Sequence, residues 1–188
     1  WQLHPHQSVW RPEVRALAPV SRWLLPAALA LTACSPALNW RQAPLGGLSF
    51  SLPCKPDKAQ RMVTLGGRDV ALEMQGCEAQ GALFAISRAR VGEATAIPEV
   101  VQAWRASALA AMRADAAAAT VLTAPSHAGV PGLASAAWLG AVGQRPQGGK
   151  VQAQLAWLVW GGDVYHLAVY ADALGADMTE SFFTDITL

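Results

Sequence analysis

The sequence predicts an α+β domain in which one long and one short helix pack on an antiparallel sheet, as in an α-β-α sandwich. Three observations lead to this fold class. Segments of alternating apolar and polar residues flank Gly-Gly pairs, which is typical of β-hairpins. One long segment repeats its apolar residues every three or four positions, as an amphipathic helix does. The order of strands, long helix, strands and short helix is that of a layered α+β domain.

The first strands are expected within residues 48–75. Residues 48–52 alternate and end before Pro53, whereas residues 61–65 and 68–75 flank a Gly66-Gly67 pair. Glycine adopts the positive φ that a two-residue hairpin turn requires. One face of this hairpin is then apolar and consists of Val63, Leu65, Val70, Leu72 and Met74. The other face carries Asp69, Glu73 and Gln75, so we expect the first face on a core and the second in water.

A further strand and the long helix follow. Residues 82–91 alternate, with Phe84 and Ile86 on one face. Pro98 suits the first position of a helix, which we expect to continue to about Ala119. The apolar stripe of this helix consists of Val101, Trp104, Ala108 and Met112. Such a stripe indicates packing against the core rather than a ligand site.

In the second half of the domain, the sequence predicts a strand over 133–142 and a second hairpin from 151–160 and 164–171. Its turn is either Gly161-Gly162 or Gly162-Asp163, and both choices place the same side chains on each face. Both faces are apolar, so we expect this hairpin near the centre of the sheet, covered on both sides. Residues 176–185 are expected to form the short closing helix, held by Phe182 and Phe183.

Residues 1–33 have the layout of a secretory signal. Arg15 and Arg22 precede an uncharged, mostly apolar run over residues 23–33, and small residues follow its leucines. The run is shorter than the roughly 20 apolar residues that span a bilayer. It ends in Leu31-Thr32-Ala33-Cys34, which resembles the lipobox of bacterial lipoproteins. The resemblance implies cleavage before Cys34 and attachment of lipid chains to its thiol.

The lipoprotein resemblance sets the expected organisation of the chain. Residues 1–33 are then a signal peptide with an N-terminal extension, 34–47 the lipidated Cys34 with its tether, and 48–188 one α+β domain. Ser35 stands where the lipoprotein family uses Asp for inner-membrane retention, which implies the periplasmic face of the outer membrane. The alternative is an ordinary secretory signal cut after Ala30 or Ala33, with Cys34 a spare thiol. Three cysteines argue against it, because an unpaired cysteine is unusual in a secreted protein.

Two resemblances concern the domain itself. The order and length of its elements resemble the PsbP/Mog1 type of α-β-α sandwich. The segments 52–56 (Leu-Pro-Cys-Lys-Pro) and 76–79 (Gly-Cys-Glu-Ala), with Arg61 and Phe182-Phe183, resemble a group of uncharacterised proteobacterial lipoproteins. Neither resemblance implies an activity.

Cys54 and Cys77 are expected to form a disulfide. Both stand at ends of expected strands, where neighbouring strands can bring their Cα atoms within about 7 Å. Export places them in an oxidising compartment. The alternatives are a metal site, which lacks further ligands nearby, and redox chemistry, which lacks a Cys-x-x-Cys motif. We expect no metal and no other cofactor.

The sequence favours a binding or accessory role over catalysis. No motif of a hydrolase, phosphate loop or dinucleotide site occurs. The net charge of +1 offers no basis for a nucleic-acid partner. Three of the 14 Lys and Arg and one of the 13 Asp and Glu lie in residues 1–33, so residues 34–188 have a net charge of −1. The expected partners are the bilayer, through Cys34, and a protein of the cell envelope.

Two other functions remain open. The first is a carrier of a small apolar ligand in a cleft lined by Trp138, Trp157 and Trp160, with His166 nearby. The alternative for these tryptophans is that they pack the core of an alanine-rich domain. The second, the least expected, is a hydrolase that uses His127 or His166. It requires both histidines and a carboxylate to converge in one cleft.

Overall fold

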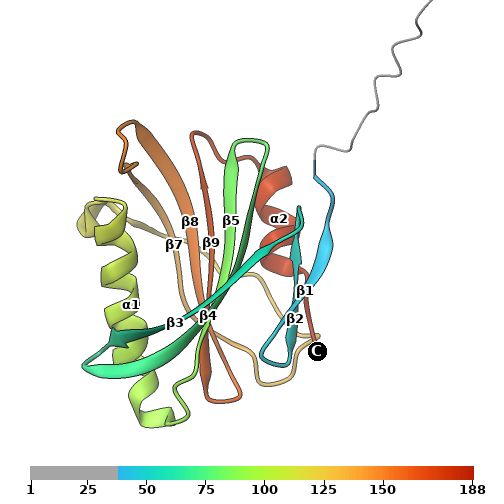
Figure 1. Cartoon of the computed structure of the whole chain (residues 1–188), viewed down its shortest axis with the longest axis vertical. Helices are drawn as coiled ribbons and strands as arrows, with labels where there is room; N and C mark the ends of the chain where they lie inside the picture. Colours follow the sequence, from blue (N-terminus) through green and yellow to red (C-terminus); the bar gives the residue numbers. More distant parts are fainter. Residues whose placement is uncertain (1–37) are drawn as a thin grey trace, which may run out of the picture. The chain divides into compact units, whose positions relative to one another are not determined.

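Seven strands form the larger of two sheets in residues 38–188, the part of the chain that the computed structural model describes (Figure 1). Every neighbouring pair in this sheet is antiparallel, and the strand order is β3-β4-β5-β9-β8-β7-β6. The α+β class is thereby confirmed. The strands are β3 (Asp57–Leu65), β4 (Arg68–Ala79), β5 (Ala82–Ala89), β6 (Thr120–Val121), β7 (Ala134–Gln144), β8 (Lys150–Trp160) and β9 (Asp163–Ala171).

The β8–β9 hairpin lies at the centre of the larger sheet, as its two apolar faces predicted. Trp160 pairs with Asp163, so the turn is Gly161-Gly162 and not Gly162-Asp163. Both glycines have positive φ, +59° and +82°, a conformation that side chains rarely adopt. The hairpin is covered on both sides because hydrophobic clusters lie on both faces of the sheet.

Helix α1 (Ile97–Ala111) covers one face of the larger sheet (Figure 1). A short 3₁₀ turn (Ala94–Ala96) leads into it, and Pro98 lies in its first turn, where no backbone N–H is needed. Its buried residues are Val100, Val101, Trp104 and Leu109. They join one cluster with Leu72, Leu155, Trp157, Val164 and Ala168 of the sheet.

A second sheet and helix α2 (Ala176–Thr184) cover the other face. The second sheet has the order β1-β2-β10 and is antiparallel, with β1 (Arg41–Leu45), β2 (Leu48–Leu52) and β10 (Ile186–Thr187). Phe50 and Leu52 of β2 and Phe182 and Phe183 of α2 are almost fully buried. They form one cluster with Phe84, Ile86, Leu158, Tyr165 and Leu167 of the larger sheet.

The prediction of a tether over residues 34–47 is wrong for residues 41–47. Residues 41–45 form β1, and Gly46-Gly47 is the turn of a hairpin with β2. Ala43 and Leu45 are buried, so the strand contributes to the core. Pro44 argued against a strand in the sequence. However, β1 is an edge strand, where a proline removes no required hydrogen bond.

The long helix ends at Ala111, eight residues before the predicted end. The alanines that follow form a separate 3₁₀ turn, Ala116–Ala118, whose residues are all exposed. Helix stability in proteins comes mainly from packing, and this alanine run has nothing to bury. Gln144 of β7 donates its backbone N–H to the Met112 carbonyl at 2.7 Å, so a neighbouring strand takes an acceptor at the helix end.

The polar face of the first hairpin is in water at Asp69, as predicted, but it is covered at Gln75. Gln75 is 5% exposed, and its side-chain amide Nε2 donates to the Pro44 carbonyl at 2.7 Å. The β1–β2 hairpin, of which the sequence predicted β2 but not β1, covers this end of the face. The apolar face packs on the α1 side as predicted, through Leu65, Val70 and Leu72.

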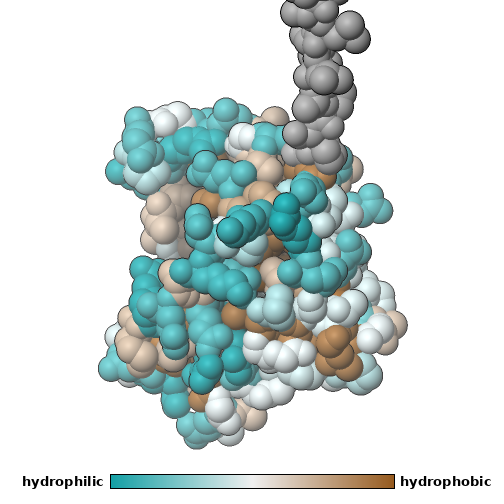
Figure 2. All heavy atoms as spheres, turned by 45° about the vertical axis from the view of Figure 1, so that its right-hand side comes forward, coloured by the Kyte–Doolittle hydropathy of each residue, from teal (hydrophilic) through white to brown (hydrophobic). Residues whose placement is uncertain are grey.

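The chain divides into two units, Trp1–Ala33 and Cys34–Leu188. Both hydrophobic clusters lie within the second unit, which therefore carries a complete core of its own. Hydrophilic residues cover most of the face of this unit in Figure 2, with hydrophobic atoms in scattered groups. Neither helix within residues 38–188 has the length and hydropathy needed to cross a membrane.

Candidate functional site

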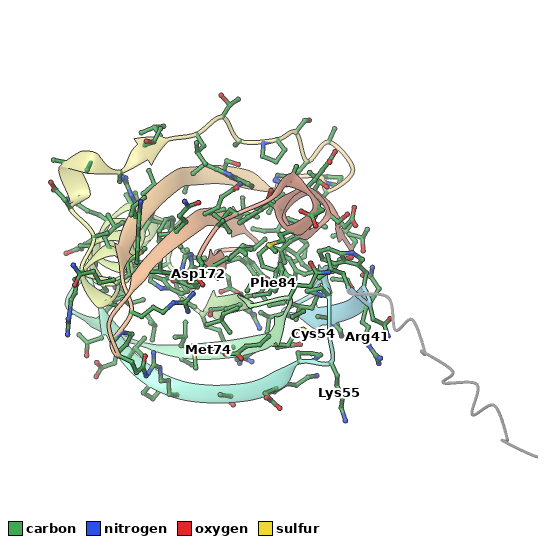
Figure 3. All side chains as sticks on the ribbon, turned by 90° about the horizontal axis from the view of Figure 1, so that it is seen from above. Arg41, Cys54, Lys55, Met74, Phe84 and Asp172 are labelled. Carbon is green, nitrogen blue, oxygen red and sulfur yellow. A yellow bond between two sulfur atoms is a disulfide. The ribbon has the colours of Figure 1, made fainter. Side chains whose placement is uncertain are left out.

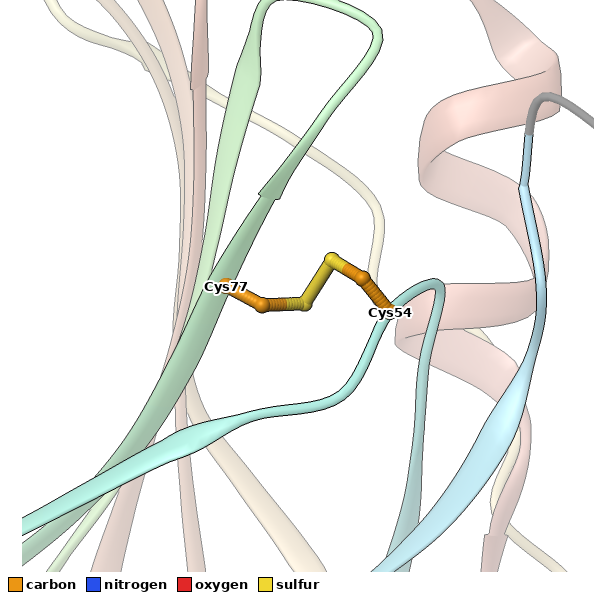
Figure 4. Close-up of a disulfide and its surroundings, with 2 residues drawn as sticks. All are labelled: Cys54 and Cys77. Carbon is orange, nitrogen blue, oxygen red and sulfur yellow. A yellow bond between two sulfur atoms is a disulfide. The ribbon is translucent and has the colours of Figure 1, made fainter.

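A disulfide joins Cys54 and Cys77, as the sequence predicted (Figure 4). Cys54 follows β2 and Cys77 lies in β4, and their Cα atoms are 5.9 Å apart. The bond therefore links the smaller sheet to the larger one. Among residues 38–188, no three His, Cys, Asp or Glu side chains gather in a way that could hold a metal ion.

His166 lies inside the α1 face of the larger sheet. Its ring stacks on Trp157 with 4.3 Å between ring centroids and meets Trp104 edge-on at 5.3 Å. Its Nδ1 is 3.1 Å from the Ala156 carbonyl, which can only accept, so Nδ1 carries the proton and donates. Burial lowers the pKa of His166 to about 4, although this hydrogen bond acts in the opposite direction. The ring is therefore neutral at pH 7 and serves as a core side chain.

His127 lies on the opposite face, with its ring 6.1 Å from that of Trp138. Trp138 in turn contacts Phe183 of α2 and belongs to the cluster under the smaller sheet. Burial lowers the pKa of His127 below its usual range. The two histidines thus lie on opposite faces of the sheet, and the convergence that a hydrolase would need does not occur.

The expected tryptophan-lined cleft is also wrong as a single site. Trp157 and His166 face α1, whereas Trp138 and Trp160 belong to the opposite cluster. Trp160 donates from Nε1 to the Pro131 carbonyl at 3.1 Å, which uses its only polar atom. The alternation of side chains along β8 explains the division, because Trp157 and Trp160 are three residues apart and point to opposite faces.

Charged side chains cluster where the β1–β2 hairpin meets the larger sheet. The Arg88 guanidinium donates from Nε to the Asp163 carboxylate at 2.8 Å, and its Nη1 is 3.6 Å from Glu73. The Tyr165 hydroxyl donates to the Gly46 carbonyl at 2.9 Å, and burial raises the pKa of Tyr165 to about 12. A Cβ on Gly46 would lie 2.4 Å from Arg88, so only glycine allows this approach. These groups neutralise one another and position the hairpin.

A polar groove lies beside this cluster, with a volume of about 420 Å³. Pro44, Leu45 and Gly46 form one side of it, and β3 and β4 form the other. Its polar lining includes Lys58, Gln60 and Glu73, of which Glu73 is already paired with Arg88 and Arg90. The carboxylate of Glu73 is therefore already neutralised by protein cations, whereas Lys58 and Gln60 are exposed on β3.

An apolar pocket of about 230 Å³ lies between α1 and the larger sheet. The lining residues are Leu83, Ala108, Ala111, Met112, Gln144, Arg145, Pro146, Val151 and Tyr170. Burial raises the pKa of the Tyr170 phenol, which stays protonated and able to donate. Arg145 forms an ion pair with Asp172 at 2.7 Å beside the pocket. Few polar groups around an apolar space are typical of a binding site.

Sequence reasoning missed this pocket because its residues come from five elements and one turn. Leu83 and Tyr170 meet only through the pairing of β5 with β9, and Ala108 faces them from α1. One weak signal was present: Ala108 is a small residue on the apolar stripe of the helix, where a larger side chain would close the space.

No model of a known protein family matches this chain, and the search of curated proteins gives no match either.

The buried His166 predicts a pH dependence of stability. The unfolded chain takes up a proton near pH 6.5, whereas the folded protein takes it up only near pH 4. Protons thus bind preferentially to the unfolded state, and we expect a loss of about 2 kcal/mol of unfolding free energy from pH 7.5 to pH 5. Urea unfolding of residues 35–188, with and without His166→Gln, measures this part as the difference between the two pH profiles. His127→Gln is the comparison: burial lowers the pKa of this half-buried ring too, so its removal should flatten the profile less, and an equal flattening would contradict the assignment.

Proposed function

We propose that the protein is a lipoprotein of the bacterial envelope, anchored through Cys34 to the periplasmic face of the outer membrane. The observation that carries the proposal is Leu31-Thr32-Ala33-Cys34 at the end of a signal-like segment. These residues lie outside the described part of the chain. The Cys54–Cys77 disulfide supports the proposal, because it leaves Cys34 as the odd cysteine.

The domain that follows acts, in this proposal, as a non-catalytic binding or accessory domain that meets a protein of the envelope. Three features support this. The His166 ring is neutral and enclosed, the Arg88 cluster is internally paired, and the two histidines are separated by the sheet. We further propose that the fold is an α-β-α sandwich of the PsbP/Mog1 type, with the smaller sheet sharing one outer layer with α2.

Lipidation of Cys34 is tested by growing cells with an alkyne-bearing fatty acid and detecting the label on the protein. We expect the label on the wild-type chain and its complete loss in Cys34→Ser, because the thiol is the acceptor. The matched control is Cys54→Ser with Cys77→Ser, which removes two other thiols and keeps the label. A label that persists in Cys34→Ser, or none on the wild type, would show that the protein is not lipidated there.

The second candidate function is the binding of a small apolar ligand. The apolar pocket beside Tyr170 favours it, in place of the tryptophan-lined cleft that the sequence suggested. The pocket adds to the anchored-domain proposal, because a lipoprotein can also carry a ligand.

A further inference from the structure

The folded domain begins only a few residues after Cys34. Asn39 donates its backbone N–H to the Pro53 carbonyl at 2.8 Å, and the Trp40 ring meets Phe84 edge-on at 6.3 Å. Asn39 is five residues after Cys34, so their Cα atoms can be at most about 17 Å apart. A lipid on Cys34 would keep this end of the domain at the membrane surface. Figure 3 looks onto this end, with Arg41 beside the entry of the chain and Phe84 in the interior.

The apolar pocket lies at the same end of the domain. Phe84 points to the cluster under the smaller sheet, whereas Leu83, the residue before it in β5, lines the pocket on the opposite face. Figure 1 shows the chain entry, the β4–β5 turn, the C-terminal end of α1 and the β7–β8 turn together at this end. The entry and the pocket lie on opposite faces of the larger sheet at this one end of the domain. The end that contains the pocket is therefore the end that a lipid on Cys34 would hold toward the membrane.

The size of the pocket suits part of a ligand rather than a whole one. Its volume of about 230 Å³ is below the roughly 300–1,000 Å³ of sites that enclose a drug-sized molecule. It exceeds the cavity of about 150 Å³ that admits benzene. A single flexible chain could fill it while the rest of the molecule stays outside.

The chemistry of the pocket fits a chain that ends in a polar head. The wall is apolar and includes Leu83, Ala108, Met112 and Val151, and Leu83 is 39% exposed. Gln144, Arg145 and the Tyr170 phenol add polar groups to the lining. Arg145 pairs with Asp172 through Nη2 only and is 37% exposed, so its other N–H groups remain accessible to a phosphate or an ester. Hydrocarbon in the pocket and polar groups beside it match a membrane lipid.

We propose that the pocket beside Tyr170 receives one hydrocarbon chain of a phospholipid from the membrane that anchors the protein. This inference rests on the proposed lipidation of Cys34, because the anchor holds the pocket at the lipid surface. The chain would bury its methylene groups against α1, β5 and β8, and the headgroup would lie by Arg145 and Tyr170. Binding is reversible and involves no covalent step.

The first experiment uses residues 35–188 with a single-chain lysophospholipid that carries a photoreactive diazirine in its acyl chain. We expect labelling of peptides that contain Leu83, Met112 or Tyr170, read by mass spectrometry after irradiation. Ala108→Phe fills the pocket and should weaken binding at least about tenfold, the effect of roughly two methylene groups no longer buried. Ala110→Phe, on the exposed side of the same helix, is the matched control and should bind as the wild type does.

A second variant tests the proposal in case Ala108→Phe does not fold. Leu83→Asp places a charge in the pocket wall and should also reduce labelling, while circular dichroism confirms the fold. Equal labelling of wild type, Ala108→Phe and Leu83→Asp would overturn the proposal, and so would labelling confined to other peptides.

The second experiment separates this proposal from the anchor. The mature protein, extracted from membranes, is placed in vesicles that contain a diazirine phospholipid. Labelling of the same peptides supports the proposal, and labelling elsewhere overturns it. Failure of the lipidation proposal would appear independently, as an N-terminal peptide without fatty acid.

Discussion

Replacing Trp157 by alanine is expected to lower the free energy of unfolding by about 3–5 kcal/mol, the usual cost of truncating a fully buried aromatic side chain. Trp157 is 0% exposed at the centre of the larger sheet, and its ring is the platform on which His166 stacks. For a domain of this size the melting temperature should fall by about 10 °C. Urea unfolding of residues 35–188, followed by circular dichroism, measures the loss.

Two variants show whether burial causes the effect. Trp160→Ala removes the same side chain from the same strand at a partly exposed position, and should cost less than half as much. Trp157→Phe should cost still less, because it keeps an aromatic ring against His166 and removes an indole N–H that has no acceptor. A loss for Trp160→Ala equal to that for Trp157→Ala would mean that Trp157 is not a central core residue.

Removal of the Cys54–Cys77 disulfide is expected to lower the free energy of unfolding by about 3.5 kcal/mol. The two cysteines are 23 residues apart in sequence, and closing such a loop in the unfolded chain gives this stabilisation in the chain-entropy model. The loss should appear in the double variant Cys54→Ser with Cys77→Ser, measured by urea unfolding against residues 35–188.

The reducing agent provides the control for the disulfide. Dithiothreitol should destabilise the wild-type domain by a similar amount and leave the double variant unchanged, since that variant has no bond to reduce. A wild-type domain whose stability does not respond to reduction, with two free thiols by mass, would contradict the bond.

The central hairpin shows what a pattern in the sequence can predict. Residues 151–160 and 164–171 are apolar on both faces, and the structure places them at the centre of the sheet with a cluster on each side. The side chains could be assigned to faces from the sequence because they alternate between the two faces of a strand. Paired neighbouring strands keep the same division of faces. The disulfide followed from similar reasoning about strand ends.

The smaller sheet shows where such patterns fail. β1 contains a proline and β10 has only two residues, so neither alternates long enough to be recognised. Both strands form because they pair with β2, which lies between them, and because their apolar side chains are buried in the cluster beneath this sheet. The predicted helix over Ala116–Ala119 was wrong for the opposite reason. Alanine favours a helix, but a helix without a buried face is marginal.

The candidate site depended on the tertiary structure almost entirely. By itself, the sequence determined the α+β class, the central hairpin and the cysteine pair, because each depends on local spacing or on residue type. Only the tertiary structure separated Trp157 and His166 from Trp138 and Trp160, and only it brought Leu83, Ala108 and Tyr170 together. The physical reason is that a pocket is a space left between elements distant in sequence, and no local pattern records which side chains will border it.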